Sequence, residues 1–206
     1  MKPAAMSLVV VFAAAAAATV LAEKPAAPTP YHGKPHVIPG KIEAEHFDKG
    51  PAGVAYRDVD EKNLGADYRE PTQVDIEKRD DASGGHGIGW TRKGEWLIYT
   101  VAIQEAGEYT LEAPVASNKQ GGRFHLEIEG KDVSGPVEIP DTGGWQTLKV
   151  IRHPGIKLPK GTFPMKVVMD QQGPSGSIGD IDYLRFIPAG DDQPAANTSP
   201  SKDSDG

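Results

Sequence analysis

The feature that most limits what this chain can fold into is a long stretch without helical periodicity. Between Ile42 and Ile187, short β-rich runs alternate with turns of Gly, Pro, Asn and Asp. Strand side chains alternate between two faces, so the apolar and polar alternation from Phe124 to Glu129 predicts a half-buried strand. Many short strands separated by turns are typical of two packed sheets. The sequence therefore predicts an all-β fold, an antiparallel two-sheet β-sandwich of the jelly-roll kind.

The expected strands cover most of this stretch. They are residues 42–47, 54–58, 74–77, 87–90, 96–103, 107–115, 122–129, 131–139, 145–150, 163–169 and 180–187. Between two of them, Gly130-Lys131 predicts a tight hairpin.

The two ends of the chain are expected to lie outside the sandwich, which spans residues 40–188. Residues 1–22 fit an export signal, because Lys2 precedes an Ala-rich apolar run and Val20-Leu21-Ala22 fits a cleavage site. That run of about 14 residues is shorter than the roughly 20 of a membrane-spanning helix, although a retained anchor is the alternative. Residues 23–39 predict a Pro-rich linker, and residues 189–206 predict a disordered tail. We therefore expect a secreted, periplasmic or cell-envelope protein with no membrane span after cleavage.

Composition argues against several classes of function. The 206 residues include no cysteine, which excludes disulfides, a thiol nucleophile and a thiolate zinc site. A formal net charge of −7 argues against a nucleic acid partner. The chain also has no Gly-x-Ser-x-Gly elbow, no phosphate loop and no His-Glu-x-x-His. We therefore expect a binding protein without catalytic residues rather than an enzyme.

Two acidic pairs point to a bound cation. Glu43 and Glu45 lie two residues apart on the first expected strand, and Asp180 and Asp182 on the last, so each pair shares one face. If these strands are neighbours, Glu43, Glu45 and Asp182 converge on one hard cation such as Ca²⁺. A solvated face with scattered acids is the alternative.

The tryptophans suggest a stacking surface. Trp90 and Trp145 each follow a glycine in a turn-rich segment, and an indole face stacks well on the apolar face of a sugar ring. Two such rings would form the walls of a slot, whereas burial of both in the core is the alternative. His86, four residues before Trp90, is expected to line the same slot. Trp96 lies in the apolar run 96–99 and is expected in the core.

Several segments, taken in order, resemble family-six carbohydrate-binding modules, which are non-catalytic β-sandwich domains attached to many bacterial glycanases. The resemblance covers nearly all of residues 40–188. It rests on 42–47 (IEAEHF), 53–58 (GVAYRD), 63–65 (NLG), 68–69 (YR), 74–77 (VDIE), 87–91 (GIGWT), 94–97 (GEWL), 107–110 (GEYT), 143–147 (GGWQT) and 180–184 (DIDYL).

The resemblance implies a role for individual residues. Trp90 and Trp145 would sandwich one sugar ring in a cleft at the loop end of the sandwich. Asp180, at a position that is usually Asn, would hydrogen-bond the same sugar, as an acceptor only when ionised. Glu95 matches an acid near the cleft, with a plain salt bridge as the alternative.

The resemblance also implies a cofactor and a partner. Glu43, Glu45 and Asp182 match the ligands of a structural calcium ion. The expected function is non-catalytic binding of a polysaccharide, at the chain end of a β-glucan, xylan or agarose-like polymer, with a glycanase as a possible partner. The alternatives are a cell-surface or matrix module for protein contact, and a glycoside hydrolase.

Overall fold

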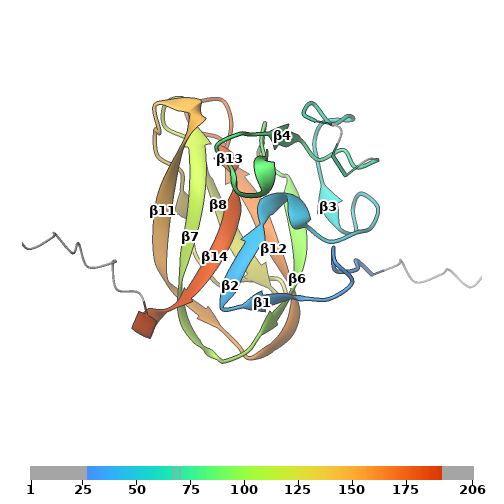
Figure 1. The fold of residues 1–206 in the computed structure, drawn as a ribbon, viewed down its shortest axis with the longest axis vertical. Coiled ribbons are helices and arrows are strands. Elements are labelled where there is room, and N and C mark those ends of the chain that lie inside the picture. Colours follow the sequence, from blue (N-terminus) through green and yellow to red (C-terminus); the bar gives the residue numbers. More distant parts are fainter. Residues whose placement is uncertain (1–26, 67, 70, 192–206) are drawn as a thin grey trace, which may run out of the picture.

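The computed structural model describes residues 27–66, 68–69 and 71–191, and its strands form two sheets around one core (Figure 1). The first sheet has the order β1 (His36–Ile38), β6 (Trp96–Ile103), β12 (Gly161–Gln171), β8 (Arg123–Ile128) and β10 (Val137–Glu138), with β3 (Tyr56–Arg57) beside β6 and β9 (Lys131–Asp132) beside β8. The second has the order β2 (Gly40–Glu43), β14 (Tyr183–Pro188), β7 (Gly107–Ser117), β13 (Asp180–Ile181), β5 (His86–Ile88) and β4 (Ile76–Lys78), with β11 (Gly144–Leu158) beside β7.

The pairing is antiparallel except between β1 and β6, which run parallel. The other elements in the described chain are three short 3₁₀ turns, η1 (Ala44–His46), η2 (Ser83–Gly85) and η3 (Ala189–Asp191). The predicted two-sheet sandwich is therefore confirmed. The first and last core strands, β2 and β14, are neighbours, which is the condition set for the predicted cation ligands to converge.

Alternating side chains build the core. In β8, Phe124, Leu126 and Ile128 are buried against the other sheet, as the sequence pattern predicts. The hairpin after β8 is also confirmed, because Glu129 and Gly130 have φ values of +53° and +71° and join Ile128 to its partner Lys131.

The prediction of a core position for Trp96 is wrong. The buried residues of β6 have odd numbers, so Trp96 lies on the outer face and is half-buried. The Nζ atom of Lys166 lies 5.1 Å from the centre of its ring. The apolar run 96–99 hides this alternation, because all of its members are hydrophobic.

The predicted linker also differs from what the structure shows. Thr29 and Lys49 exchange two backbone hydrogen bonds of 2.9 and 2.7 Å, Tyr31 stacks on His46 with ring centres 4.4 Å apart, and β1 lies within the same segment. Residues from 29 onward therefore pack on the sandwich. The predicted export signal, and residues 192–206 of the predicted tail, lie outside the described residues. Within the described part, no helix is long and apolar enough to cross a membrane.

Candidate functional site

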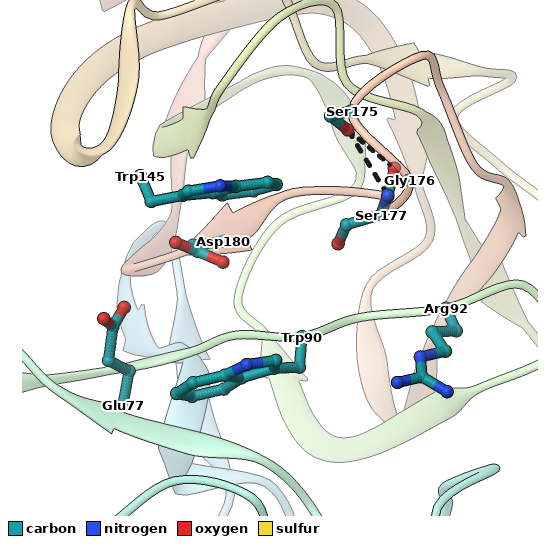
Figure 2. A pocket seen from close by; sticks show the side chains of 8 residues that line it. All are labelled: Glu77, Trp90, Arg92, Trp145, Ser175, Gly176, Ser177 and Asp180. Atoms are coloured by element: carbon teal, nitrogen blue, oxygen red, sulfur yellow. Dashed lines mark hydrogen bonds between the residues drawn. The ribbon is translucent and has the colours of Figure 1, made fainter.

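A cleft of about 400 Å³ opens at one end of the sandwich, and two indoles form its walls. Figure 2 shows Trp90 and Trp145 on opposite sides with their flat faces toward each other, and Asp180 between them. We call this the indole cleft. Its lining residues are Glu77, Trp90, Arg92, Trp145, Ser175, Gly176, Ser177 and Asp180.

Trp90 is presented by a strained backbone. It follows β5 with φ of +48°, a left-handed conformation that is uncommon for a bulky residue, and its side chain is 41% exposed. On one side the Gly89 amide donates to the carbonyl of Asp75 at 3.0 Å, and on the other Thr91 is buried. The turn is therefore made by Trp90 itself, between two anchored neighbours.

Trp145 is the second residue of β11, and the chain before it is fixed to β7. Gly143 has φ of +94°, which few other residues adopt. The Thr142 hydroxyl accepts from the Ser117 amide at 2.9 Å, and the Thr142 amide donates to the Ser117 carbonyl at 3.1 Å. This anchor sets where the half-buried indole of Trp145 faces.

Thr91 clamps the serine-containing loop that closes the cleft. Its hydroxyl donates to the Gly179 carbonyl at 2.6 Å and accepts from the Gly179 amide at 3.0 Å. Ser177 Oγ donates to the Thr91 carbonyl at 2.8 Å. The strand end that carries Trp90 and the loop that carries Ser175 and Ser177 are thus held as one unit.

The floor of the cleft is an ion-pair network around Arg79, which is fully buried. Its Nη1 atom lies 3.0 Å from Asp180 Oδ2 and 2.6 Å from Glu77 Oε2, and its Nη2 atom lies 3.0 Å from Asp81 Oδ2. Gln146 donates to Glu77 Oε1 at 2.7 Å. The carboxylates of Glu77 and Asp180 are therefore held in place as hydrogen-bond acceptors at the cleft.

Burial raises the pKa of Asp180 to about 7, and repulsion from Glu77 adds to this while Arg79 opposes it. An ionised carboxylate only accepts hydrogen bonds, which suits the hydroxyl groups of a polar ligand. The cleft thus combines two aromatic faces with oriented acceptors.

Two of the predicted cleft residues lie elsewhere. His86 is on β5, but its ring stacks on Tyr68 with centres 4.1 Å apart, and it is not among the residues that line the cleft. Glu95 is buried behind the cleft wall, where its Oε2 accepts from the Arg92 amide at 2.9 Å. Neither side chain is therefore among those that line the cleft. For His86, nearness in sequence to Trp90 did not fix the direction of the side chain.

The sequence reasoning missed four lining side chains, those of Glu77, Arg92, Ser175 and Ser177. Glu77 follows buried Ile76 in an expected strand, so alternation was a signal that it faces away from the core. The serines lie in a Gly- and Ser-rich loop whose position depends on the hydrogen bonds between Thr91 and the loop residues Ser177 and Gly179. No pattern in the sequence predicts those contacts.

The predicted cation ligands do converge, and we call Glu43, Glu45 and Asp182 the first acidic group. Ser83 joins two of them, since its hydroxyl donates to Glu43 Oε1 at 2.9 Å and its amide donates to Asp182 Oδ2 at 3.1 Å. Only Glu43 lies on a strand, while Glu45 lies in η1. Burial, with repulsion from Glu43 and Asp182, raises the pKa of Glu45 to about 8.

This group leaves oxygen atoms that need a partner. Glu43 Oε2, Glu45 Oε2 and Asp182 Oδ1 are buried and accept no hydrogen bond from the described residues. A Cβ on Gly84 would lie 3.4 Å from Glu45 Oε1, so the glycine leaves room beside the carboxylates. These residues fit a hard cation with oxygen ligands. In the described chain, however, the three acids whose ligand atoms all lie within 4.8 Å of one another are Asp58, Asp60 and Asp75.

Comparison with known proteins identifies the family to which this fold belongs. The family model of carbohydrate binding module (family 6) matches residues 65–188. The clotting factor G alpha subunit of Tachypleus tridentatus is 29% identical over 106 residues, which are 50% of this chain and 16% of that protein. The β-agarase AgaA of Microbulbifer thermotolerans is 30% identical over 103 residues, 50% of this chain and 24% of that protein. The chain thus spans less than a quarter of the length of either relative.

A solved structure shows the same arrangement over most of the chain. The carbohydrate-binding module of Cellvibrio mixtus lichenase 5A, solved with cellotriose, is 26% identical with a TM-score of 0.52. The match covers 72% of this chain and 95% of that one. With the family model matching more than half of its residues, this chain belongs to the family 6 carbohydrate-binding modules, which bind sugars and are not themselves catalytic.

Proposed function

We propose that this protein binds the end of a polysaccharide chain by holding one sugar ring between Trp90 and Trp145. The observation that carries the proposal is the pair of indole faces across the cleft, with Asp180 between them. The C–H groups of a pyranose ring stack on indole, and its hydroxyls donate to fixed carboxylates. A single ring held between two walls leaves little room for the chain to continue on both sides, which favours a terminal sugar.

The ligands and substrates of related proteins support a class of glycan for this proposal. The Cellvibrio mixtus module was solved with cellotriose, and a relative is a β-agarase. We therefore favour a β-glucan or an agarose-like polymer, with xylan also to be tested. By analogy with stacked bases, each stacked ring contributes about 1–3 kcal/mol, so one sandwiched sugar gives binding in roughly the high-micromolar to millimolar range.

We also propose that the first acidic group holds a structural calcium ion. Support comes from three buried oxygens without a partner, on Glu43, Glu45 and Asp182. The ion lies outside the indole cleft, because none of these residues lines it. Its role is to join β2, η2 and the start of β14.

We further propose that the protein acts outside the cytoplasm, because residues 1–22 fit an export signal. A glycanase is its proposed partner.

Removing one indole tests the proposed function. Trp145→Ala should weaken binding of cello-, laminari-, xylo- or agaro-oligosaccharides by about 5- to 150-fold, because one of the two stacked faces, worth about 1–3 kcal/mol, is lost. Isothermal titration measures the affinity. The matched control is Trp96→Ala, since Trp96 is half-buried on the outer face of β6 and does not line the cleft.

The same titration separates terminal from internal binding. For terminal binding, oligosaccharides of increasing length keep one site per molecule and nearly constant affinity. The capacity of a polymer then scales with the number of its chain ends. If Trp145→Ala binds as well as the unchanged protein, the cleft is not the sugar site.

A further inference from the structure

A second group of acids lies behind the wall of the indole cleft, and we infer that Asp58, Asp60, Asp75 and Glu95 form a further divalent-cation site. We call it the second acidic group. It shares no residue with the first acidic group, and none of its members lines the cleft. The inference does not depend on the proposed sugar-binding function.

The spacing of these acids suits one ion. The ligand oxygens of Asp58, Asp60 and Asp75 all lie within 4.8 Å of one another. Oxygens bound to the same calcium ion at about 2.4 Å can be no farther apart than about 4.8 Å. Three carboxylates can therefore reach a single calcium ion from their present positions.

Each acid has one oxygen tied to the protein. Asp75 Oδ1 accepts from the Leu64 amide at 2.5 Å, and Asp58 Oδ1 accepts from the Asp60 amide at 2.8 Å. Asp60 Oδ1 lies 3.2 Å from Arg92 Nη1, and Glu95 Oε2 lies 2.9 Å from the Arg92 amide. These contacts fix the orientation of the carboxylates before any ligand arrives.

The second oxygens are buried and unsatisfied. Asp60 Oδ2, Asp75 Oδ2 and Glu95 Oε1 have no hydrogen-bond partner among the described residues. The side chains of Asp75 and Glu95 lie deep, with relative exposures of 2% and 7%. A buried carboxylate oxygen without a partner is costly, so three of them from three different acids favour the binding of a cation at this place.

The charge of the group points the same way. Among the described residues, these four acids make one ion pair, between Asp60 and Arg92, so one guanidinium faces four carboxyl groups. Asp58 and Asp75 both lie close enough to Glu95 for their like charges to repel it. A divalent ion would remove most of this repulsion. Oxygen ligands in an irregular arrangement suit Ca²⁺ better than Mg²⁺, which demands near-ideal octahedral geometry.

The position of the group connects it to the cleft. Asp60 holds the guanidinium of Arg92, which lines the cleft, and Glu95 holds the Arg92 amide. The carbonyl of Asp75 accepts from the Gly89 amide, directly before Trp90. A bound ion would therefore fix the segment that presents Trp90 and Arg92, whereas the first acidic group joins β2 to β14.

Cation counting tests the inference. The full chain is stripped of metal, loaded with Ca²⁺ and freed of excess, and its calcium is measured by elemental analysis. We expect about two ions per chain for the unchanged protein, about one for Asp60→Asn/Glu95→Gln and about one for Glu43→Gln/Asp182→Asn. The matched control Asp80→Asn, which changes an exposed acid, should keep both ions.

The inference is overturned if Asp60→Asn/Glu95→Gln retains the same calcium content as the unchanged protein. If that double variant does not fold, Asp60→Asn alone serves, because Asp60 is only partly buried. Crystals of the unchanged protein soaked in Tb³⁺ give an independent measurement. An anomalous peak among the four acids supports the site, and a peak at the first acidic group alone overturns it.

Sugar titration keeps the two hypotheses apart. Trp145→Ala should lose sugar binding and keep its full calcium content. A protein that binds two ions but no sugar would contradict the proposed function while leaving the cation site intact.

Discussion

At the scale of single residues, Trp90 holds a backbone conformation that its side chain disfavours. A positive φ brings Cβ close to the following carbonyl and costs about 1–2 kcal/mol for a non-glycine residue. Such strain collects at sites that clamp ligands. The hydrogen bonds of Gly89 and Thr91 hold the strained turn in place.

Replacing Trp90 should separate strain from function. Both Trp90→Ala and Trp90→Gly should lose sugar affinity, but Trp90→Gly should be the more stable of the two by up to about 1 kcal/mol. Glycine avoids the Cβ penalty, and this outweighs its greater freedom in the unfolded chain. Urea denaturation measures the difference in free energy of unfolding.

The matched control is the same pair of substitutions at Trp96. That residue lies in β6 without a positive φ, so Trp96→Gly should be less stable than Trp96→Ala. If the Gly variant is less stable than the Ala variant at position 90 as well as at position 96, the backbone of Trp90 is not strained.

At the scale of elements, β1 is the strand that the sequence did not reveal. It has three residues between Pro35 and Pro39, and prolines normally mark extended linkers. Its register is set by parallel pairing to the edge of β6, with His36 opposite Val101 and Ile38 opposite Ile103. Such a long-range contact leaves no local pattern in so short a segment.

Ile38 tests whether β1 belongs to the fold. Ile38→Ala should lower the free energy of unfolding by about 2–4 kcal/mol, because its side chain is fully buried in the core. The neighbouring Val37 is 47% exposed, and Val37→Ala should change stability by less than about 0.5 kcal/mol. Thermal or denaturant unfolding provides the measurement. Equally small effects of both substitutions would show that β1 does not stabilise the fold and behaves as a linker.

Elsewhere the sequence predicted strands well where alternation or a compact apolar run was strong. The expected strand 96–103 is β6, and 107–115 is β7 without its last two residues. The expected strand 145–150 is too short, because β11 continues through Pro154-Gly155 with a register shift between His153 and Ile156. In a sequence, Pro and Gly usually mark the end of a strand, whereas Pro154 and Gly155 lie at a bulge within β11.

At the scale of the whole molecule, the first acidic group joins the first and last core strands, with Tyr183 opposite Glu43 in the sheet. If calcium binds there, it binds the folded chain and stabilises it by mass action, by about 2.7 kcal/mol at a hundredfold excess over the dissociation constant. Adding Ca²⁺ to metal-stripped protein should therefore raise its melting temperature.

Comparing the calcium-dependent rise in melting temperature between variants shows which acidic group binds the ion. In Glu45→Gln/Asp182→Asn the calcium-dependent gain should shrink, while Asp80→Asn should keep it in full. Scanning calorimetry with calcium or chelator makes the comparison. Identical melting with both additives would contradict structural calcium at either acidic group.

The convergence of Glu43, Glu45 and Asp182 was predicted from strand spacing and one assumed pairing. The pairing of β2 with β14 is present, but Glu45 reaches the group from η1 rather than from a strand. The acceptors of the cleft were less predictable. Glu77, Arg92 and the serines come from three segments of the chain, and their meeting depends on buried contacts of Arg79 and Thr91. Polar contacts between distant segments produce no repeating pattern in the sequence, unlike the alternation that predicts a strand.

The pairing along β7 has a consequence for how another domain could carry this protein. Gly144, next to Trp145, lies opposite Ser117 at one end of β7, and Pro188 lies opposite Tyr109 near the other end. Eight residues at about 3.3 Å each separate these points by roughly 26 Å. A catalytic unit attached beyond residue 191 would therefore join the module at the end away from the mouth of the indole cleft.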